Sequence, residues 1–223
     1  MMDKIIVTGG LGILGDALVA HLVKRGDEVA VVDLAEDDGR SAAQHVFGGV
    51  DLTQPDKVEK AFKDAKTAMG GVTGLANIAG GFIWQPVIDG DVASFDKMFA
   101  INLRTAVIAS NAVTALLDQG GSIVNVGAAA VKAPGMGMAS YTASKAGVHA
   151  LTESLAEEVA DRGIRVNAIL PTILDTPTNR ADMPDADTSS WVQPDAAADV
   201  FGFLLSDASR AITGALIPVN RGR

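Results

Sequence analysis

Short runs of apolar residues alternate along the chain with longer segments in which apolar residues recur at helical spacing. The short runs are rich in branched side chains and predict seven strands, at residues 4–8, 28–32, 46–50, 72–78, 122–126, 164–170 and 215–219. The longer segments predict helices, at 14–26, 55–69, 91–98, 105–117, 141–162 and 195–205. Because strands joined by helices form parallel sheets, we expect one α/β domain over residues 1–223. Its core is predicted to be a doubly wound, seven-stranded parallel sheet with helices on both faces.

The first predicted strand ends in a glycine-rich turn that leads into a helix. Gly9, Gly12 and Gly15 are evenly spaced, and glycines in this pattern permit a tight turn and a close approach of the backbone to a pyrophosphate. Ile13 and Leu14 open the following helix, whose N-terminal N–H groups bind phosphates. We therefore expect all five residues to contact a dinucleotide cofactor.

The second predicted strand ends at Asp33, about twenty residues beyond the glycine turn, where a carboxylate accepts hydrogen bonds from the adenosine ribose hydroxyls. Asp33 also repels a 2′-phosphate, and Leu34 and Ala35 follow it without an arginine or lysine. We therefore expect NAD(H) to be preferred over NADP(H). The alternative is an acidic residue that only caps a turn at the end of the strand.

The composition restricts the partners and the compartment. The formal net charge of −9 repels nucleic acids and anionic membranes, so we expect neither as a partner. The sequence has no cysteine, which fits a reducing compartment. It also shows no signal peptide and no long apolar run, so a cytoplasmic location is expected. His21, His45 and His149 lie on separate segments, and we expect them to be structural and no metal to bind.

Residues 127–145 contain a pair of side chains that is suited to proton transfer. Tyr141, the only tyrosine, precedes Lys145 by four positions, so on a helix the two side chains lie on one face. A cation held beside a phenol favours the phenolate and lowers the pKa of the phenol towards neutral pH. The spacing therefore predicts an acid/base pair, although tyrosine and lysine also occur at this spacing on ordinary solvated helices.

In their order and separation, these motifs resemble the short-chain dehydrogenase/reductase family over nearly the whole chain. The matching residues are Thr8, Gly9, Gly12, Gly15, Asp33, Asp51, Asn77, Ala79, Gly80, Asn102, Tyr141, Lys145, Pro171 and Thr176. The resemblance implies a Rossmann domain that binds a nicotinamide cofactor, with Tyr141 as the proton donor or acceptor. It implies that Lys145 lowers the pKa of Tyr141 and holds the nicotinamide ribose, and that Asn102 orders a proton-relay water.

The same resemblance extends the expected cofactor site and implies assembly. Further cofactor contacts are expected at Asp51, Leu52, Asn77, Ala79, Gly80, Pro171, Ile173 and Thr176. Members of the family commonly pair their subunits through the helices that correspond to residues 103–118 and 143–161. We therefore expect a homodimer or a homotetramer.

One position departs from the family pattern. The family has a serine thirteen residues before the tyrosine, which donates to the substrate carbonyl oxygen, and here Ala128 stands at that position. Loss of such a donor costs on the order of 3 kcal/mol of transition-state stabilisation. Ser140 and Ser144 are near in sequence, but neither is expected to replace it. Either the protein reduces plain carbonyls poorly, or its substrate does not need this donor.

A long polar segment begins at Pro171 and extends to residue 194. It is too long for a simple connection, so we expect a substrate-binding loop at 171–194. Residues 170–191 resemble the same segment of the dihydropteridine reductase branch of the family, through the runs 170–180, 183–187 and 189–191. That branch also uses NADH and has alanine at the serine position, whereas Asn102 is a feature of the ordinary family members that the branch lacks. Within the loop, two roles are open to Arg180: it contacts a polar substrate, or it pairs with Asp182 or Asp185, which is the favoured prediction.

Aromatic residues occur in two places where a substrate is expected. Phe82, Ile83 and Trp84 follow the fourth predicted strand on a loop. Three roles are open to them: covering a planar ligand, forming a hydrophobic lid, or contacting another subunit. Trp191 lies in the polar segment. Trp84 and Trp191 are therefore candidates to flank the substrate.

These features support three hypotheses. The first is an NADH-dependent reductase that delivers hydride to a conjugated substrate, with a quinonoid dihydropterin as the candidate. Such a ring spreads the incoming charge over its nitrogens, so its reduction depends little on one serine hydroxyl. The second is an ordinary short-chain alcohol dehydrogenase or carbonyl reductase that tolerates Ala128. The third is a protein that binds NAD(H) without catalysis.

Overall fold

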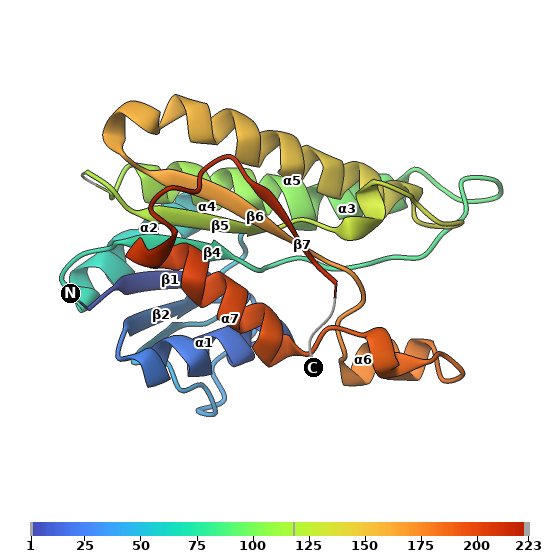
Figure 1. The fold of residues 1–223 in the computed structure, drawn as a ribbon, viewed down its shortest axis with the longest axis horizontal. Helices are drawn as coiled ribbons and strands as arrows, with labels where there is room; N and C mark the ends of the chain where they lie inside the picture. The colour runs from blue at the N-terminus through green and yellow to red at the C-terminus, as the bar shows by residue number, and fades with distance from the viewer. Residues whose placement is uncertain (1, 118, 221–223) are drawn as a thin grey trace.

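A computed structural model describes residues 2–117 and 119–220, and its central feature is one sheet of seven parallel strands (Figure 1). The strands are β1 (Lys4–Thr8), β2 (Glu28–Val32), β3 (His45–Phe47), β4 (Gly74–Asn77), β5 (Ser122–Val126), β6 (Arg165–Pro171) and β7 (Leu216–Val219). Their spatial order is β3-β2-β1-β4-β5-β6-β7. The predicted doubly wound, seven-stranded parallel sheet is therefore confirmed.

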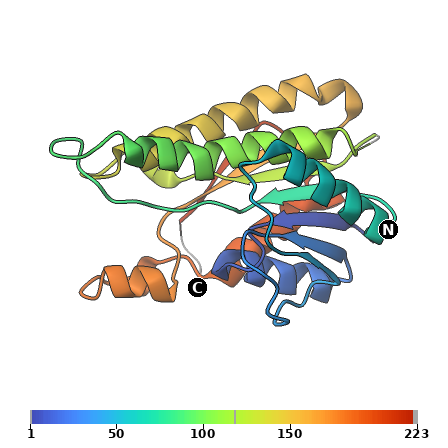
Figure 2. The same cartoon turned by 180° about the vertical axis from the view of Figure 1, so that it is seen from behind.

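Helices cover both faces of this sheet, as Figures 1 and 2 show. The larger helices are α1 (Ile13–Arg25), α2 (Pro55–Met69), α4 (Thr105–Thr114), α5 (Ala139–Glu158) and α7 (Pro194–Leu205). Because successive side chains of a strand point to opposite faces, Ile5 and Val7 pack in a core with α1 and α7. Ile6 packs in the other core, with α2, α4 and α5. The strands read as continuous apolar runs because both of their faces are buried.

A π-helix joins two helices that the sequence predicts as separate elements. The short helix α3 (Ala93–Met98) runs directly into the π-helix Phe99–Arg104, which runs directly into α4. The widened turn of a π-helix is rare and is often found at functional sites, and here it contains Asn102. No helix in the described part of the chain is both long enough and apolar enough to cross a bilayer.

Some predicted boundaries are wrong by a few residues. The third strand ends at Phe47 rather than near residue 50, and the fourth begins at Gly74 rather than at residue 72. The N-cap position of α2 is Gln54, and no side chain caps the helix. The neighbouring Thr53 hydroxyl donates a hydrogen bond to Asp51 Oδ1 at 2.7 Å.

The carboxyl ends of the central strands meet at one edge of the sheet. Thr8 at the end of β1 is paired with Asn77 at the end of β4, and Asn77 is paired with Asn125 of β5. The strand order reverses between β1 and β4, since the chain passes from β1 to β2 on one side and returns to β4 on the other. Ligands of doubly wound sheets bind at this edge, beside the point of reversal.

Candidate active site

The turn after β1 is shaped by glycines at positions where a side chain does not fit. Gly9 adopts a φ of +70°, and a Cβ at this residue would lie 2.7 Å from Ala79 N. A Cβ at Gly15 would overlap the carbonyl oxygen of Gly9. Gly12 caps α1 without a side-chain hydrogen bond, so the first N–H groups of the helix, which begins at Ile13, lack helical partners. This arrangement fits the pyrophosphate of a dinucleotide.

Asp33 follows β2 at the same edge of the sheet and is held in place by two backbone donors. Its Oδ2 accepts from the N–H of Leu11 at 3.0 Å, and its Oδ1 accepts from the N–H of Ala35 at 3.0 Å. The carboxylate thus caps a turn, which is the alternative role predicted for Asp33 from the sequence. Each carboxylate oxygen keeps a second lone pair, so the half-buried Asp33 is still able to accept from ribose hydroxyls.

Three further residues expected at the cofactor are largely engaged within the protein. The side chains of Leu14 and Leu52 lie in the two cores, which leaves only their backbone groups for a ligand. Asn77 Nδ2 donates to Asn125 Oδ1 at 2.9 Å and to Ser110 Oγ at 3.1 Å. The Asn77 amide therefore ties β4 to β5 and to α4.

Asp51 and Ala79 border the same edge. Asp51 Oδ1 accepts from both the hydroxyl and the N–H of Thr53, at 2.7 and 2.9 Å. These hydrogen bonds hold the pKa of Asp51 below its ordinary value, so the carboxylate stays ionised. The N–H of Ala79 donates to the carbonyl of Thr8 at 3.1 Å. This bond places the segment after β4 directly against the glycine turn.

Tyr141 and Lys145 lie one turn apart on α5, as predicted. Lys145 is buried, and its Nζ donates to the carbonyl of Val126 at 2.8 Å. Burial raises the pKa of Tyr141 to about 12 and lowers the pKa of Lys145 to about 8. The expected lowering of the tyrosine pKa is therefore wrong for this structure, because burial of the phenol disfavours the charged phenolate. Tyr141 remains protonated at neutral pH.

Asn102 joins the loop after β4 to α5. Its Oδ1 accepts from the N–H of Gly81 at 2.9 Å, and its Nδ2 donates to Gly81 O at 3.1 Å and to Ser144 Oγ at 3.0 Å. A Cβ at Gly80 would lie 2.5 Å from Asn102 Oδ1 and 3.6 Å from Lys145 Nζ. The fold thus brings Gly80, Asn102 and Lys145 together from three segments of the chain.

Ala128 lies just after β5 and is 3% exposed. Its N–H donates to His149 Nε2 at 3.2 Å, and a Cβ at Gly127 would lie 2.5 Å from the same nitrogen. Because Nε2 accepts this bond, His149 is neutral and carries its proton on Nδ1, and burial lowers its pKa. His149 therefore holds the backbone of residues 127–128, a role that the sequence does not reveal.

Neither nearby serine supplies the missing hydroxyl. Ser144 Oγ donates to the carbonyl of Tyr141 at 2.7 Å and accepts from Asn102. Ser140 is fully buried, and its hydroxyl has no hydrogen-bond partner among the described residues. The site therefore presents an alanine methyl group where the family pattern has a serine hydroxyl.

The segment after β6 is more structured than the predicted loop. Pro171 ends β6 at the carboxyl edge of the sheet. The segment then forms α6 (Pro177–Asp182), for which Thr176 is the N-cap, because Thr176 Oγ1 accepts from the N–H of Asn179 at 3.2 Å. A short 3-10 turn follows at Thr188–Ser190. Thr176 is thus occupied in capping a helix.

Arg180 is paired, but not with the residues that the sequence suggests. Its guanidinium donates to both carboxylate oxygens of Asp175, at 2.5 and 2.7 Å, rather than to Asp182 or Asp185. Gln193 Nε2 also donates to Asp175, at 2.8 Å. The prediction of an ion pair is right and the predicted partners are wrong, because α6 turns the guanidinium back towards the start of the segment.

The two tryptophans do not form a pair around a substrate. Trp191 is 4% exposed, whereas Trp84 is 55% exposed on the loop after β4. Trp191 is therefore largely shielded from solvent and is not available to an incoming ligand. Ile173, expected at the cofactor, is partly exposed just after β6.

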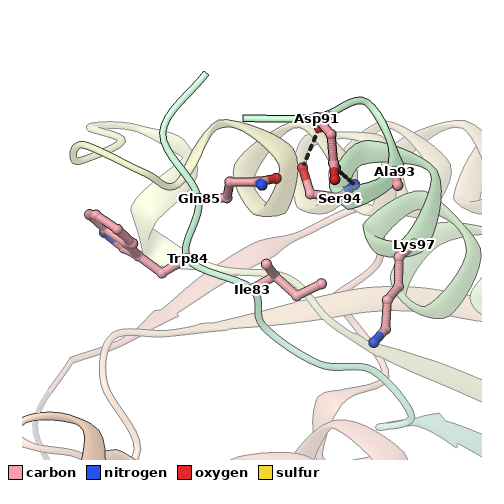
Figure 3. A pocket seen from close by; sticks show the side chains of 7 residues that line it. All are labelled: Ile83, Trp84, Gln85, Asp91, Ala93, Ser94 and Lys97. Carbon is pink, nitrogen blue, oxygen red and sulfur yellow. Dashed lines mark hydrogen bonds between the residues drawn. The ribbon is translucent and has the colours of Figure 1, made fainter. Parts of the chain in front are cut away.

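A hollow of about 290 Å³ opens between the loop after β4 and α3, and Figure 3 shows the side chains that line it. The lining residues are Ile83, Trp84, Gln85, Asp91, Ala93, Ser94 and Lys97. Ser94 is held at the helix start by Asp91, whose carboxylate accepts from the Ser94 N–H at 3.2 Å. Since neither Tyr141 nor Lys145 lines the hollow, it lies beside the reacting groups rather than around them.

The fold and the geometry at the carboxyl edge are those of an oxidoreductase that binds a nicotinamide dinucleotide. A family model described as short chain dehydrogenase matches residues 3–187, and the chain belongs to the short-chain dehydrogenase/reductase family. Enzymes of this family use NAD or NADP.

Characterised relatives align with almost the whole chain. The 2-(S)-hydroxypropyl-CoM dehydrogenase 3 of Xanthobacter autotrophicus is 33% identical, over 99% of this chain and 96% of the relative. The L-rhamnose 1-dehydrogenase (NAD(P)(+)) of Azotobacter vinelandii is 29% identical, over 100% and 97%. Among solved structures, the aldohexose dehydrogenase of Thermoplasma acidophilum superimposes with a TM-score of 0.89, at 23% identity over 98% of this chain and 92% of that chain. This last likeness supports the fold alone.

Proposed function

We propose that the protein transfers hydride between NAD(H) and a small organic substrate, with Tyr141 supplying the proton in the direction of reduction. The observation that carries this proposal is the meeting of Gly80, Asn102 and Lys145 beside the carboxyl ends of β4 and β5. A bound nicotinamide supplies the hydride. Lys145 would hold its ribose, and Asn102 would support the supply of protons to Tyr141.

The cofactor is proposed to lie across the carboxyl edge of the sheet. The phosphates would meet the turn at Gly9–Gly15 and the start of α1, where unpaired N–H groups favour anions. Asp33 would bind the adenosine ribose, and its charge would exclude a 2′-phosphate. NAD(H) is therefore the proposed cofactor.

Replacement of Asp33 by asparagine tests this preference. The Asp33→Asn variant keeps one oxygen to accept from Leu11 or Ala35 and loses the charge that repels a 2′-phosphate. We expect the ratio of NADPH to NADH dissociation constants to fall about tenfold, which corresponds to about 1.4 kcal/mol. Titration of each nucleotide measures the ratio. Asp37→Asn, which removes a charge from the same exposed loop, is the control, and tighter binding of NADPH than NADH by the unaltered protein would contradict the preference.

The proposed substrate is a conjugated ring compound, with a quinonoid dihydropterin as the first candidate. The buried methyl group of Ala128 favours this choice, because an electron-poor ring spreads the incoming charge over several atoms and does not depend on one hydroxyl donor. Steady-state oxidation of NADH with saturating quinonoid dihydropterin is the direct assay. The pterin proposal fails if NADH is not consumed above background.

An ordinary alcohol dehydrogenase or carbonyl reductase is the second candidate, and the names of the relatives favour it. One relative, from Sphingobium indicum, is a diol dehydrogenase at 30% identity over 97% of this chain and 94% of its own length. In this case the substrate oxygen would sit beside Ala128 and lack a hydroxyl donor. Slow turnover of simple ketones is then the expected behaviour.

Restoring the serine separates the two candidates. If a carbonyl oxygen sits beside residue 128, Ala128→Ser should raise kcat/KM for ketones about a hundredfold, since one donor of this kind contributes roughly 3 kcal/mol. Turnover of a quinonoid dihydropterin should change by less than about threefold, which is below 1 kcal/mol. Ala129→Ser, which adds a hydroxyl at the half-buried neighbouring position, is the matched control. Unchanged ketone turnover in Ala128→Ser would count against the carbonyl candidate.

The remaining expectations also stand as proposals. Residues 171–194 are proposed to bind substrate as part of a single domain over residues 1–223, because the segment leaves the sheet at the carboxyl edge. A homodimer or homotetramer is proposed because Phe99 and Val107 remain exposed on the π-helix and α4. Light scattering of the purified protein measures its mass and tests the second of these proposals.

A further inference from the structure

The ring of Tyr141 is packed against a second aromatic ring. Phe82, on the loop after β4, meets Tyr141 edge to face, with ring centroids 5.0 Å apart and an angle of 81° between the planes. Pairs of this geometry are favourable, so Phe82 holds the orientation of the phenol. Phe82 is also 51% exposed, and a substantial apolar surface therefore lies open beside the group that supplies the proton.

Trp84 is anchored on the segment that leads into α5. Its indole N–H donates to the carbonyl of Met136 at 2.9 Å, and the N–H of Gln85 donates to the carbonyl of Gly137 at 2.9 Å. A Cβ at Gly137, which has a φ of +77°, would overlap the indole. The indole thus lies directly on the glycine backbone, only a few residues before Tyr141.

Trp84 and Met136 leave much of their apolar surface in water. Trp84 is 55% exposed and Met136 is 78% exposed. Figure 3 shows the indole on the other side of the loop from the side chains of Ile83 and Gln85. Exposed apolar surface is unfavourable relative to burial, and adjoining exposed apolar residues mark sites where ligands bind. We use the name aromatic rim for the side chains of Phe82, Trp84 and Met136 together.

Arg180, a cation on the expected substrate segment, is already paired. Arg180 donates to both carboxylate oxygens of Asp175, so its guanidinium is occupied within the protein. Lys132 lies on the segment before α5 and is exposed, and the hollow beside Trp84 is lined by one cation, Lys97, and one anion, Asp91. The aromatic rim itself carries no charge, which favours an uncharged ligand.

Building on the proposed hydride transfer, we propose that the substrate carries an uncharged ring that stacks on Trp84 and contacts Phe82 and Met136 while its reacting atom faces Tyr141. Stacking would retain the ring in the site and present its reacting atom to the phenol. This arrangement replaces the orientation that a serine at residue 128 would give. The ring, rather than a hydrogen bond from residue 128, is then the feature that the protein selects.

Two diketones and a keto acid test this selection, because butanedione and phenylglyoxylate each differ from phenylpropanedione in one group. Phenylpropanedione carries an uncharged ring, butanedione has no ring, and phenylglyoxylate has a ring and a negative charge. We expect phenylpropanedione to have the highest kcat/KM, by about tenfold or more over butanedione, because aromatic contact adds to the buried apolar area. Equal kcat/KM values for phenylpropanedione and butanedione, or a preference for phenylglyoxylate, would overturn the proposal while leaving hydride transfer intact.

Substitution of the indole locates the effect. Trp84→Leu should raise KM for phenylpropanedione about tenfold, with kcat, the KM for butanedione and the NADH dissociation constant nearly unchanged. Ile88→Ala, which alters another exposed apolar residue of the same loop, should leave all four values unchanged. A ring preference that survives in Trp84→Leu would overturn the proposal. A lower mass of Trp84→Leu in light scattering would overturn it too, because the aromatic rim would then be a subunit contact.

A binding measurement separates this proposal from the proposed function. Trp191 is buried and Trp84 is exposed, so phenylpropanedione added to the NAD⁺ complex should quench the fluorescence of Trp84. The same quenching should be absent from Trp84→Leu. Quenching without turnover of any of the three compounds would support ring binding and refute hydride transfer to such substrates. Turnover without quenching would support hydride transfer and refute ring binding.

Discussion

Replacing Tyr141 with phenylalanine is expected to lower kcat about a thousandfold and to leave the NADH dissociation constant within about twofold. General acid catalysis contributes about 10²–10⁴-fold, and the protein has no second tyrosine. Burial raises the pKa of Tyr141 to about 12, so the phenol keeps its proton through neutral and moderately alkaline pH. It is therefore available as an acid in the direction of reduction.

The substitution keeps the packing of the site, since phenylalanine preserves the ring that packs edge to face against Phe82. Steady-state kinetics gives kcat, and thermal unfolding confirms that the variant is folded. Phe82→Leu disturbs the same ring pair and leaves the phenol hydroxyl in place, so it measures the contribution of the ring contact separately from that of the hydroxyl. If Tyr141→Phe retains more than about a tenth of the activity, another group donates the proton and the assignment is wrong.

Lys145→Met is expected to remove most of the activity and, at the same time, to change how stability depends on pH. Lys145 is buried, and burial lowers its pKa from 10.5 to about 8. Between these two values the unfolded chain binds a proton that the folded chain does not. The free energy of unfolding of the unaltered protein therefore rises with pH in this window, and the contribution is lost as the pH falls through 8.

Methionine has no titrating group, so this rise should be absent from the variant. Between pH 7 and pH 10, we expect the free energy of unfolding of the unaltered protein to rise by about 2 kcal/mol more than that of Lys145→Met. Urea unfolding at several pH values measures the difference. Lys66→Met is the control, because the Lys66 ammonium also donates to a backbone carbonyl, that of Leu116 at 2.9 Å, from a half-buried position. Parallel pH curves for Lys145→Met and the unaltered protein would contradict the burial of a charged ammonium.

The parts of the fold and site that local spacing determines are predictable from the sequence. Gly15 is required by a contact with the carbonyl of Gly9 within the same turn, and Gly9 has a positive φ that favours glycine, so the glycine spacing marks the turn. The apolar runs predict the strands because both faces of a parallel sheet are buried. The four-residue spacing of Tyr141 and Lys145 likewise follows from the helix period.

The missed features depend on contacts between distant segments, and backbone atoms supply several of them. Lys145 donates to the carbonyl of Val126, and His149 accepts from the N–H of Ala128. No residue type in the sequence marks a backbone carbonyl or N–H as a partner. Trp84 meets Met136 in the same way. Such contacts become visible only when the strands are arranged in the sheet.

Burial explains the two errors that bear most on chemistry. The sequence places a cation near Tyr141 and so predicts a lowered pKa, but it does not show that the phenol is partly buried, and burial raises the pKa instead. Trp191 lies in a polar segment and yet is buried. In both cases the surrounding fold, rather than the local sequence, determines the exposure.

Direct transfer of hydrogen from NADH to a ring substrate is the central claim, and isotope transfer tests it most directly. NADH carrying deuterium at both C4 positions is incubated with the protein and phenylpropanedione, and the reduced product is analysed by mass spectrometry. One carbon-bound deuterium per product is predicted, with product formation lowered about a thousandfold in Tyr141→Phe. Reduction of quinonoid dihydropterin forms only N–H bonds that exchange with water, so slower oxidation of the deuterated than of the unlabelled NADH is the readout for that compound. Phenylpropanedione product without deuterium, or no turnover of either compound, would contradict the claim.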